Sequence, residues 1–258
     1  MAGPAAAQVN TERLRLGQSE EGWSGFVALR LAAKEGNTDR LAAGLGFRVQ
    51  YAEPEPGERS DDLPSLDPLM KRLVFLVAEG DYAEESGERS EYRSFAHLRW
   101  VERRSPKLAH EVFLQNEFNE FQRLDSRYLL GFGERITLLR KPSREVFLGL
   151  GLMGEAERLD VPDVGPDERT SEFVRASTYL AAQMKLGSKG ATVVNTLYYQ
   201  PRVDRWDDFR ILEELDLRVP LAEHLELSLA IVVQHDSEAP EDVEEWDLSV
   251  TNALRVRF

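Results

Sequence analysis

The chain has 258 residues, a formal net charge of −14, 30% charged residues and no cysteine. Because proteins that bind phosphate backbones need a basic face, this charge argues against nucleic acid as a partner. No apolar run approaches the roughly 20 residues of a membrane-spanning helix, which excludes helical membrane proteins. The lack of cysteine excludes disulfides and thiolate metal sites, and it fits either a reducing or an oxidising compartment.

The first ten residues, MAGPAAAQVN, contain neither the basic nor the apolar region of a signal peptide. We therefore expect either a cytosolic protein or a processed form that carries an added starting methionine. Residues 1–20 are polar and show no pattern, and we expect a flexible segment there, periplasmic in the second case. The predicted folded domain is 21–258.

From Trp23 onward the polarity alternates with a period of two, which is typical of strands with one apolar face. The stretches WSGFVALRLAAK and RLAAGLGFRVQY flank Gly36-Asn37-Thr38-Asp39, a turn composition, and predict a hairpin. The same pattern continues to the end of the chain. It predicts about twelve strands, near residues 23–34, 39–52, 70–82, 91–103, 107–121, 127–140, 144–158, 171–187, 191–203, 209–221, 225–236 and 245–258.

Each predicted strand has a continuous apolar face, such as Val146, Leu148, Leu150 and Leu152, opposite a face of charged and small residues. In a soluble sandwich or lipocalin-type barrel the apolar face forms the core. In an outer-membrane barrel the apolar face meets lipid and the charged face lines the interior. The alternation itself is compatible with both architectures.

Three features favour the membrane barrel. The predicted strands are longer than the usual ~5 to 6 residues of soluble strands. Tight turns such as Ser105-Pro106-Lys107 alternate with longer acidic connections such as YAEESGERSE, as outer-membrane barrels prefer. The connection at 53–68 breaks this alternation. Aromatic residues also gather near strand ends, where the aromatic girdles of a bilayer would lie: Trp23, Tyr51, Tyr82, Trp100, Tyr128, Tyr199, Trp206 and Trp246.

The last segment, LSVTNALRVRF, ends on Phe258 with apolar residues at alternate positions before it. It resembles the C-terminal signal that the barrel-assembly machinery of bacteria reads, so Phe258 is the predicted assembly signal. A soluble protein that ends on an edge strand is the alternative. The sequence thus predicts an all-β fold, an antiparallel up-and-down transmembrane β-barrel of about twelve strands. Its partners would be outer-membrane lipid, lipopolysaccharide and the assembly machinery.

Five segments carry a family resemblance: QVNTERLR, GNTD, SFAHLRW, NEFNEFQRLDSRYLLGFG and NALRVRF. They are similar to an uncharacterised family of bacterial outer-membrane proteins whose members are labelled salt-induced outer membrane proteins. The resemblance covers nearly the whole chain after about residue 8 and implies a fold and a location in the Gram-negative outer membrane. It implies no catalytic residues.

No arrangement of catalytic or metal-binding residues stands out, and we expect neither enzymatic activity nor a cofactor. The four histidines, His97, His110, His224 and His235, lack the spacing of metal ligands. Glu134 lies on an otherwise apolar face, where a carboxylate at bilayer depth is costly. The glycine-rich segments GLGLMG and LLGFGE lie inside strands, which favours small interior-facing residues over a phosphate-binding loop.

The interior charges therefore carry the functional prediction. The side chains expected to line the lumen are Arg30, Arg48, Arg93, Arg99, Glu111, Glu117, Arg135, Glu155, Arg175, Lys185, Glu214, Asp216, Arg218, Arg255 and Arg257. If they face water, the barrel is a narrow passive channel for small, anionic solutes, because basic linings favour anions. If they pair with one another, the barrel is closed and has a structural or envelope-stress role. We take the channel as the leading hypothesis, ahead of the closed barrel and of a soluble ligand-binding β-barrel.

Overall fold

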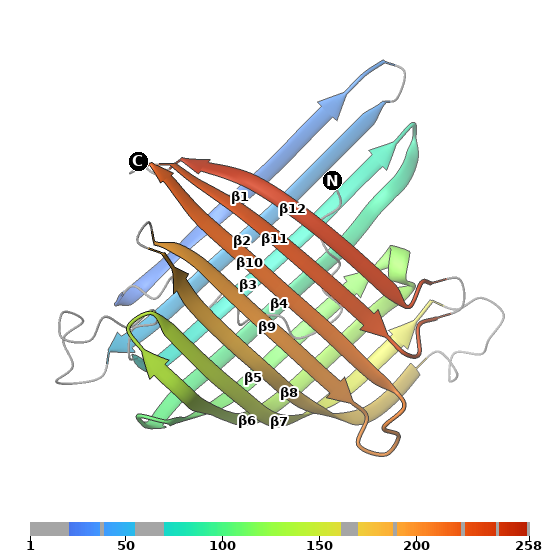
Figure 1. Cartoon of the computed structure of the whole chain (residues 1–258). Coiled ribbons are helices and arrows are strands. Elements are labelled where there is room, and N and C mark those ends of the chain that lie inside the picture. Colours follow the sequence, from blue (N-terminus) through green and yellow to red (C-terminus); the bar gives the residue numbers. More distant parts are fainter. Residues whose placement is uncertain are drawn as a thin grey trace.

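The computed structural model describes residues 21–36, 39–54, 70–160, 170–187, 190–222, 225–240 and 243–256. These residues form twelve strands and one short 3-10 helix (Figure 1). The elements are β1 (Gly22–Lys34), β2 (Arg40–Pro54), β3 (Met70–Glu85), β4 (Glu88–Ser105), β5 (Leu108–Asn119), η1 (Glu120–Gln122), β6 (Leu124–Lys141), β7 (Arg144–Leu159), β8 (Thr170–Leu186), β9 (Ala191–Pro201), β10 (Phe209–Ala222), β11 (Leu225–Asp236) and β12 (Trp246–Val256).

All twelve strands belong to one sheet, and each pairs antiparallel with the strand that follows it in the chain. The predicted all-β, antiparallel, up-and-down fold is therefore confirmed. The predicted strand ranges agree with the observed ones to within a few residues, because the alternation of polarity is maintained along nearly the full length of each strand.

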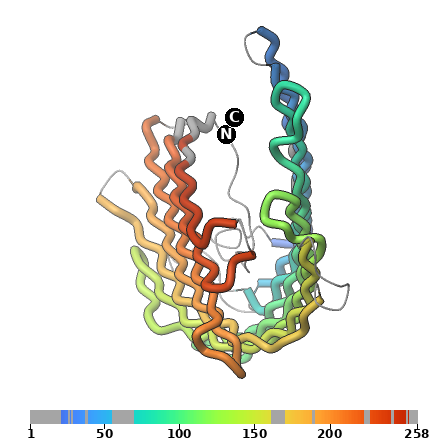
Figure 2. Tube along the Cα trace, turned by 90° about the vertical axis from the view of Figure 1, so that its right-hand side faces the viewer, coloured from blue at the N-terminus to red at the C-terminus, as the bar shows by residue number. Residues whose placement is uncertain are grey.

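The sheet curls so that the N-terminal strands, in blue, and the C-terminal strands, in red, form two facing walls (Figure 2). The sheet order begins at β1 and ends at β12, and no backbone pairing joins these two strands within the described residues. The structure is therefore a strongly curled open sheet, and the closed barrel predicted from the sequence is not found in it.

The connection between β3 and β4 is shorter than the sequence suggested. The predicted long acidic loop, YAEESGERSE, is a hairpin whose strands continue to Glu85 and from Glu88. Ser86 and Gly87 have φ angles of 53° and 83°. Two successive positive φ angles are typical of the tight turns that match the twist of a hairpin, so charged residues expected in a loop extend the strands instead.

The two faces of the sheet differ sharply in exposure. The apolar face is turned outward: Trp23, Leu31 and Leu248 are 75%, 72% and 69% exposed. The concave inner face carries most of the buried charged side chains, among them Arg99 and Glu145, at 1% and 0% exposure. Charged residues thus form much of the interior, and apolar residues form the outer surface. The alternation of polarity in the sequence was compatible with either face being outside. No helix among the described residues is long and apolar enough to span a membrane.

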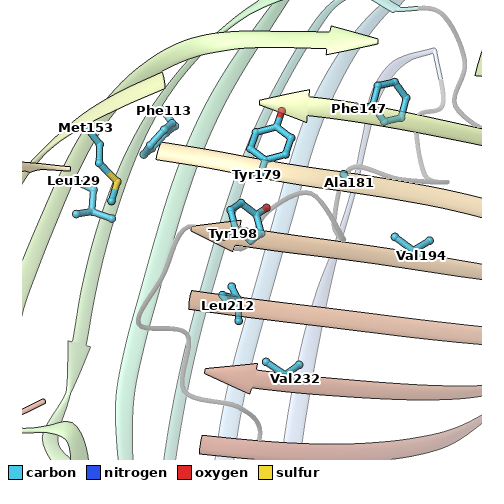
Figure 3. Close-up of a cluster of buried hydrophobic side chains, with 10 residues drawn as sticks. All are labelled: Phe113, Leu129, Phe147, Met153, Tyr179, Ala181, Val194, Tyr198, Leu212 and Val232. Atoms are coloured by element: carbon cyan, nitrogen blue, oxygen red, sulfur yellow. The ribbon is translucent and has the colours of Figure 1, made fainter. Parts of the chain in front are cut away.

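The inner face also contains apolar clusters that the sequence analysis did not predict. The larger one lies across β5 to β11 (Figure 3): Phe113, Leu129, Phe147, Met153, Tyr179, Ala181, Val194, Tyr198, Leu212 and Val232. Glycines make room for its rings. A Cβ on Gly149 would lie 2.0 Å from the Tyr179 ring, and one on Gly131 would lie 2.1 Å from the Phe113 ring. These glycines belong to the segments predicted to contain small interior-facing residues.

Several predictions fall outside the described residues. These are the N-terminal segment 1–20, residues 55–68 of the connection that breaks the alternation of loop lengths, Arg257, and the predicted assembly signal Phe258. Arg255 lies on β12, where its backbone is the register partner of Glu226 on β11. Its side chain is not among those that the structure describes.

Candidate functional site

Most of the predicted lumen-lining residues lie on the inner face. Buried there are Arg48, Arg99, Glu111, Glu117, Arg135, Glu155, Arg175, Glu214 and Asp216. Arg93 and Arg218 are half-buried. Arg30 and Lys185 are exposed, because Arg30 lies on the edge strand β1 and Lys185 lies near the end of β8. Arg30 still reaches inward, with its Nη2 2.7 Å from Asp81 Oδ1.

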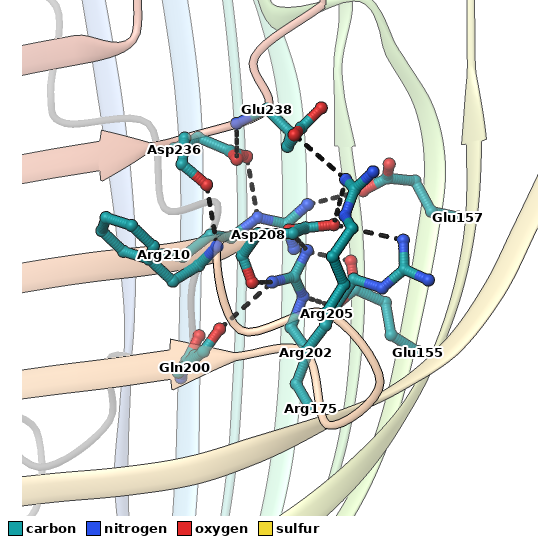
Figure 4. Close-up of polar contacts among 12 residues, drawn as sticks. Glu155, Glu157, Arg175, Gln200, Arg202, Arg205, Asp208, Arg210, Asp236 and Glu238 are labelled. Atoms are coloured by element: carbon teal, nitrogen blue, oxygen red, sulfur yellow. Dashed lines mark hydrogen bonds and ion pairs between the residues drawn. The ribbon is translucent and has the colours of Figure 1, made fainter.

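Arg210 on β10 is the centre of a cluster of buried ion pairs (Figure 4). It donates to Glu155 Oε1 at 2.6 Å, to Glu157 Oε2 at 3.0 Å and to Asp236 Oδ2 at 2.7 Å. Both glutamates come from β7, which is not a sheet neighbour of β10. The ion pairs therefore cross the concave side of the sheet and connect strands far apart in the sheet order.

Arg127 on β6 approaches the same carboxylates from the other side. Its guanidinium lies 3.2 Å from Glu155 Oε1, 3.5 Å from Glu117 Oε2 and in contact with Glu157. Two arginines thus share two glutamates, all at 7% exposure or less. Burial of a charge is costly unless it is paired and hydrogen-bonded, and here the pairing is extensive.

Arg175 on β8 extends this cluster to the β9–β10 connection. It donates to Glu155 Oε2 at 3.2 Å and to Asp208 Oδ1 at 2.7 Å. Asp208 also accepts from Arg202 and Arg205 of the same connection. We call Arg127, Glu155, Glu157, Arg175, Asp208, Arg210 and Asp236 the ion-pair region.

At the rim of the ion-pair region, the β9–β10 connection has its own surface pair. Arg202 donates to both oxygens of Asp204, at 3.0 and 2.7 Å. This hydrogen bonding lowers the pKa of the Asp204 carboxyl and raises the pKa of Arg202. Because Asp204 is exposed to solvent, the pair contributes little to the stability of the fold. Its role is to hold the β9–β10 connection in place.

A second part of the inner face combines arginines with aromatic rings. The guanidinium carbons of Arg48, Arg99 and Arg135 lie over the rings of Phe75, Phe113 and Phe147, at 5.6, 5.4 and 3.9 Å from the centroids. Such cation–π contacts contribute ~0.5 to 2 kcal/mol, more when desolvated. We call these six residues, with Tyr179 and Glu111, the arginine–aromatic region.

Tyr179 connects this region across the curl of the sheet. Its hydroxyl donates to Glu111 Oε2 at 2.8 Å and accepts from Arg135 Nη1 at 3.1 Å. Tyr179 lies on β8 and Glu111 on β5, so this hydrogen bond also joins strands that are not neighbours. Beside it, the His97 ring is fully buried, stacked at 5.6 Å from Phe113 and within 2.9 Å of Gln115.

The predicted set omitted five residues of the ion-pair region: Arg127, Glu157, Asp208, Arg210 and Asp236. The period of two could have identified most of them. Arg127 shares the face of Arg135, Glu157 that of Glu155, and Arg210 that of Glu214. Asp208 lies in a connection, where alternation has no predictive value.

One histidine has a carboxylate partner that its spacing in the sequence did not indicate. Nδ1 of His110 lies 2.5 Å from Oε1 of Glu134, its register partner on β6. Cross-strand pairing also explains how Glu134 is accommodated on the apolar outer face. No group of three or more potential metal ligands lies together in the part of the chain that the structure describes.

The fold and its inner face define a class: a curled, up-and-down antiparallel sheet with charged residues inside and apolar residues outside. The family described as "Protein of unknown function, DUF481" matches residues 74–258, so the chain belongs to this family. The match covers β4 to β12 and most of β3. Neither the curated proteins nor the solved structures contain a match.

Proposed function

We propose that the chain is an outer-membrane β-barrel of the Gram-negative envelope, as its resemblance to the salt-induced outer membrane proteins implies. The observation that carries this proposal is the exposed apolar face. On β4, the outward residues from Trp100 to Tyr92 are eight positions apart (100 − 92), about 26 Å along a strand. At a tilt of about 40° this spans ~20 Å, close to the apolar band of outer-membrane barrels.

The membrane location is tested by refolding the protein into lipid vesicles. We expect it to remain with the vesicles, to resist added protease, and to shift in gel mobility when boiled. A protein that stays folded and soluble without detergent would contradict the proposal and favour a soluble ligand-binding β-barrel.

We propose further that β1 and β12 pair in the membrane and close the barrel. An unpaired sheet edge in hydrocarbon leaves backbone groups without hydrogen bonds, at several kcal/mol each. The absence of native cysteine makes this testable by cross-linking. Leu29→Cys on β1, combined in turn with Leu248→Cys and Val250→Cys on β12, should give an intramolecular disulfide in vesicles. If neither combination cross-links while Leu29→Cys with Leu45→Cys, its partner on β2, does, the barrel is open.

We propose that the interior is closed and that the protein has a structural or envelope-stress role. The supporting observation is the ion-pair region, where arginines from β6, β8 and β10 meet carboxylates from β7, β11 and the β9–β10 connection. Side chains held in such pairs fill the lumen beside the apolar cluster. This reverses the order of preference reached from the sequence, where the channel came first.

A narrow channel for small anionic solutes is the second candidate, and the arginine–aromatic region favours it. Its charged residues are Arg48, Arg99, Arg135 and Glu111, three positive and one negative, a net of +2. Basic linings favour anions. The charged residues of this region lie on β2, β4, β5 and β6, and Phe147 and Tyr179 extend it to β7 and β8.

Single-channel current across a planar bilayer, with a salt gradient, distinguishes the two. If the interior is closed, we expect folded protein in the bilayer to give no current steps. Discrete current steps with an anion-leaning reversal potential would support the channel. Replacing Arg99 and Arg135 by glutamine should then reduce the anion preference, whereas Arg89→Gln, an exposed arginine paired with Glu120, should leave it unchanged.

A further inference from the structure

A row of charged side chains crosses the outer face near the tight turn that joins β4 to β5. In the register of the sheet, Glu53 on β2 is opposite Arg72 on β3, and Arg72 is opposite Glu102 on β4. Glu102 is opposite His110 on β5, and His110 is opposite Glu134 on β6. We call these five residues the charged row. Acids and bases alternate along it without interruption.

The side chains of the charged row are paired yet still accessible. Arg72 Nη1 lies 3.4 Å from Glu53 Oε2, and His110 Nδ1 lies 2.5 Å from Glu134 Oε1. Arg72, His110 and Glu134 keep 41%, 37% and 42% of their side-chain surface exposed. Glu134 Oε2 is itself buried and makes no hydrogen bond within the described part of the chain.

The next outward row, on the side away from the β4–β5 turn, is entirely uncharged. It consists of Tyr51, Val74, Trp100, Val112 and Phe132, each opposite the next in the register. Tyr51 continues this row to Trp23 on β1, with ring centroids 5.3 Å apart. Tyrosine and tryptophan concentrate where hydrocarbon meets headgroups. In a membrane, this uncharged row would be part of an aromatic girdle. The charged row would then lie on the headgroup side of the girdle, where the apolar surface ends.

The charged row stops at β7, where Glu134 is opposite Leu150. This is expected from the geometry of a tilted sheet. Because the strands are inclined to the barrel axis, a row of register partners climbs relative to the membrane plane and leaves the headgroup layer after a few strands. The row is thus a local site on β2 to β6.

We propose that the charged row binds the headgroup of a zwitterionic phospholipid that carries both a phosphate and a primary ammonium group. Arg72 and His110 supply donors for the phosphate oxygens, and Glu53, Glu102 and Glu134 supply acceptors for the ammonium N–H groups. Neighbouring strands are about 4.8 Å apart, which suits a headgroup whose two charges are joined by a short linker. This proposal rests on the proposed membrane location.

The charges of the row favour a zwitterion over an anionic lipid. Lys71 Nζ lies 3.2 Å from Glu53 Oε1 and Arg104 Nη1 lies 3.2 Å from Glu102 Oε1, so the row and its flanks present both signs of charge. A headgroup that bears phosphate alone would leave the carboxylates of the row without a matching cation. A quaternary ammonium headgroup has the right charges but no N–H to donate to the carboxylates. Phosphatidylethanolamine and phosphatidylcholine with identical acyl chains therefore differ in the one property that the row recognises.

The test measures which of these two lipids the protein retains. Protein refolded in equimolar phosphatidylethanolamine and phosphatidylcholine vesicles is extracted, and its bound lipids are counted by native mass spectrometry. We expect wild type to enrich phosphatidylethanolamine about two- to fivefold. This is the ratio of affinities that the free energy of one exposed ion pair produces. Glu102→Gln/Glu134→Gln should lose this enrichment.

The matched control is Glu172→Gln/Glu213→Gln, which removes two outward-facing carboxylates from β8 and β10, outside the row. It should keep the wild-type enrichment. If the double row variant fails to fold, the single change Glu102→Gln replaces it and should reduce the enrichment.

The outcomes separate this proposal from the membrane location. Protein that inserts, as shown by protease protection and the gel shift, but shows no preference between the lipids overturns the headgroup site and leaves the membrane location intact. Equal loss of the preference in both double variants would also overturn the headgroup site. Failure to insert overturns both proposals.

Discussion

The two regions of the inner face accommodate buried arginines in different ways. In the ion-pair region, Arg127, Arg175 and Arg210 meet carboxylates at hydrogen-bonding distance. In the arginine–aromatic region, Arg48, Arg99 and Arg135 lie over phenylalanine rings, and a tyrosine hydroxyl joins Arg135 to Glu111. The first arrangement neutralises charge, whereas the second leaves a net positive lining.

This difference matters for both proposed functions. A neutralised cluster that spans β6 to β11 fills space and holds distant strands together, as a closed barrel requires. A positive lining supported by rings keeps an electrostatic preference for anions. The two proposed functions therefore differ in which of the two regions controls the interior.

The largest expected effect comes from Arg210→Ala in the ion-pair region. It removes the partner of Glu155, Glu157 and Asp236 and leaves buried carboxylates under-paired. Breaking a buried pair costs roughly 3 to 5 kcal/mol. The free energy of unfolding, measured by urea titration of the vesicle-bound protein, should fall by this amount. Arg89→Ala, which removes an exposed pair with Glu120, should cost less than about 1 kcal/mol. Equal losses would mean that the buried network contributes no more than a surface pair.

Tyr179→Phe tests the arginine–aromatic region with a smaller change. It keeps the ring but removes the hydroxyl that bridges Glu111 and Arg135. We expect a loss of about 1 to 3 kcal/mol in unfolding free energy, because two buried polar groups lose a partner. Tyr199→Phe, on the outer face of β9, is the control and should change little. A neutral result for both would show that the bridge is dispensable.

Gly149→Ala sharpens the comparison through packing alone. The added Cβ would lie 2.0 Å from the Tyr179 ring and would force the ring to move. Overpacking of this kind costs about 1 to 3 kcal/mol. On the same strand, a Cβ on Gly154 meets its nearest atom at 4.0 Å, so Gly154→Ala should be neutral. Comparable destabilisation by both variants would locate the effect in the backbone.

The smallest expected effect concerns pH and the β9–β10 connection. Because the Arg202 hydrogen bond lowers the pKa of Asp204, the pair stabilises the folded state above the ordinary aspartate pKa of about 3.9. That contribution should disappear as the pH falls through the lowered pKa. Asp204→Asn should therefore flatten the dependence of unfolding free energy on pH only at the acidic end. A difference that persists unchanged at acidic pH would contradict this account.

The strands were predictable because their signal is local. Alternation along β7, from Val146 to Leu152, needs no information from other parts of the chain. The same rule assigned Arg48, Arg99 and Glu155 to one face, and the structure places all three inside. It also assigned Arg30 to this face, and Arg30 reaches Asp81, although its position on the edge strand leaves the side chain exposed. The rule failed at the β3–β4 turn, where backbone angles rather than polarity decide the length.

The candidate site was predictable residue by residue, but its pairings were not. Neither Arg210 with Glu155 nor Tyr179 with Glu111 belongs to adjacent strands. Such contacts depend on how strongly the sheet curls, which no local pattern reports. The pairing of His110 with Glu134 required the register of β5 against β6, which the turn and bulge geometry determines.

The sequence by itself therefore determined an all-β chain of about twelve antiparallel strands, each with one apolar and one charged face, because a period of two is a property of consecutive residues. Only the tertiary structure decided that the apolar face lies outside, that the buried arginines divide between carboxylates and rings, and that a row of charged side chains bounds the apolar surface. These depend on the curvature and register of the whole sheet, which bring together residues separated by dozens of positions in the chain.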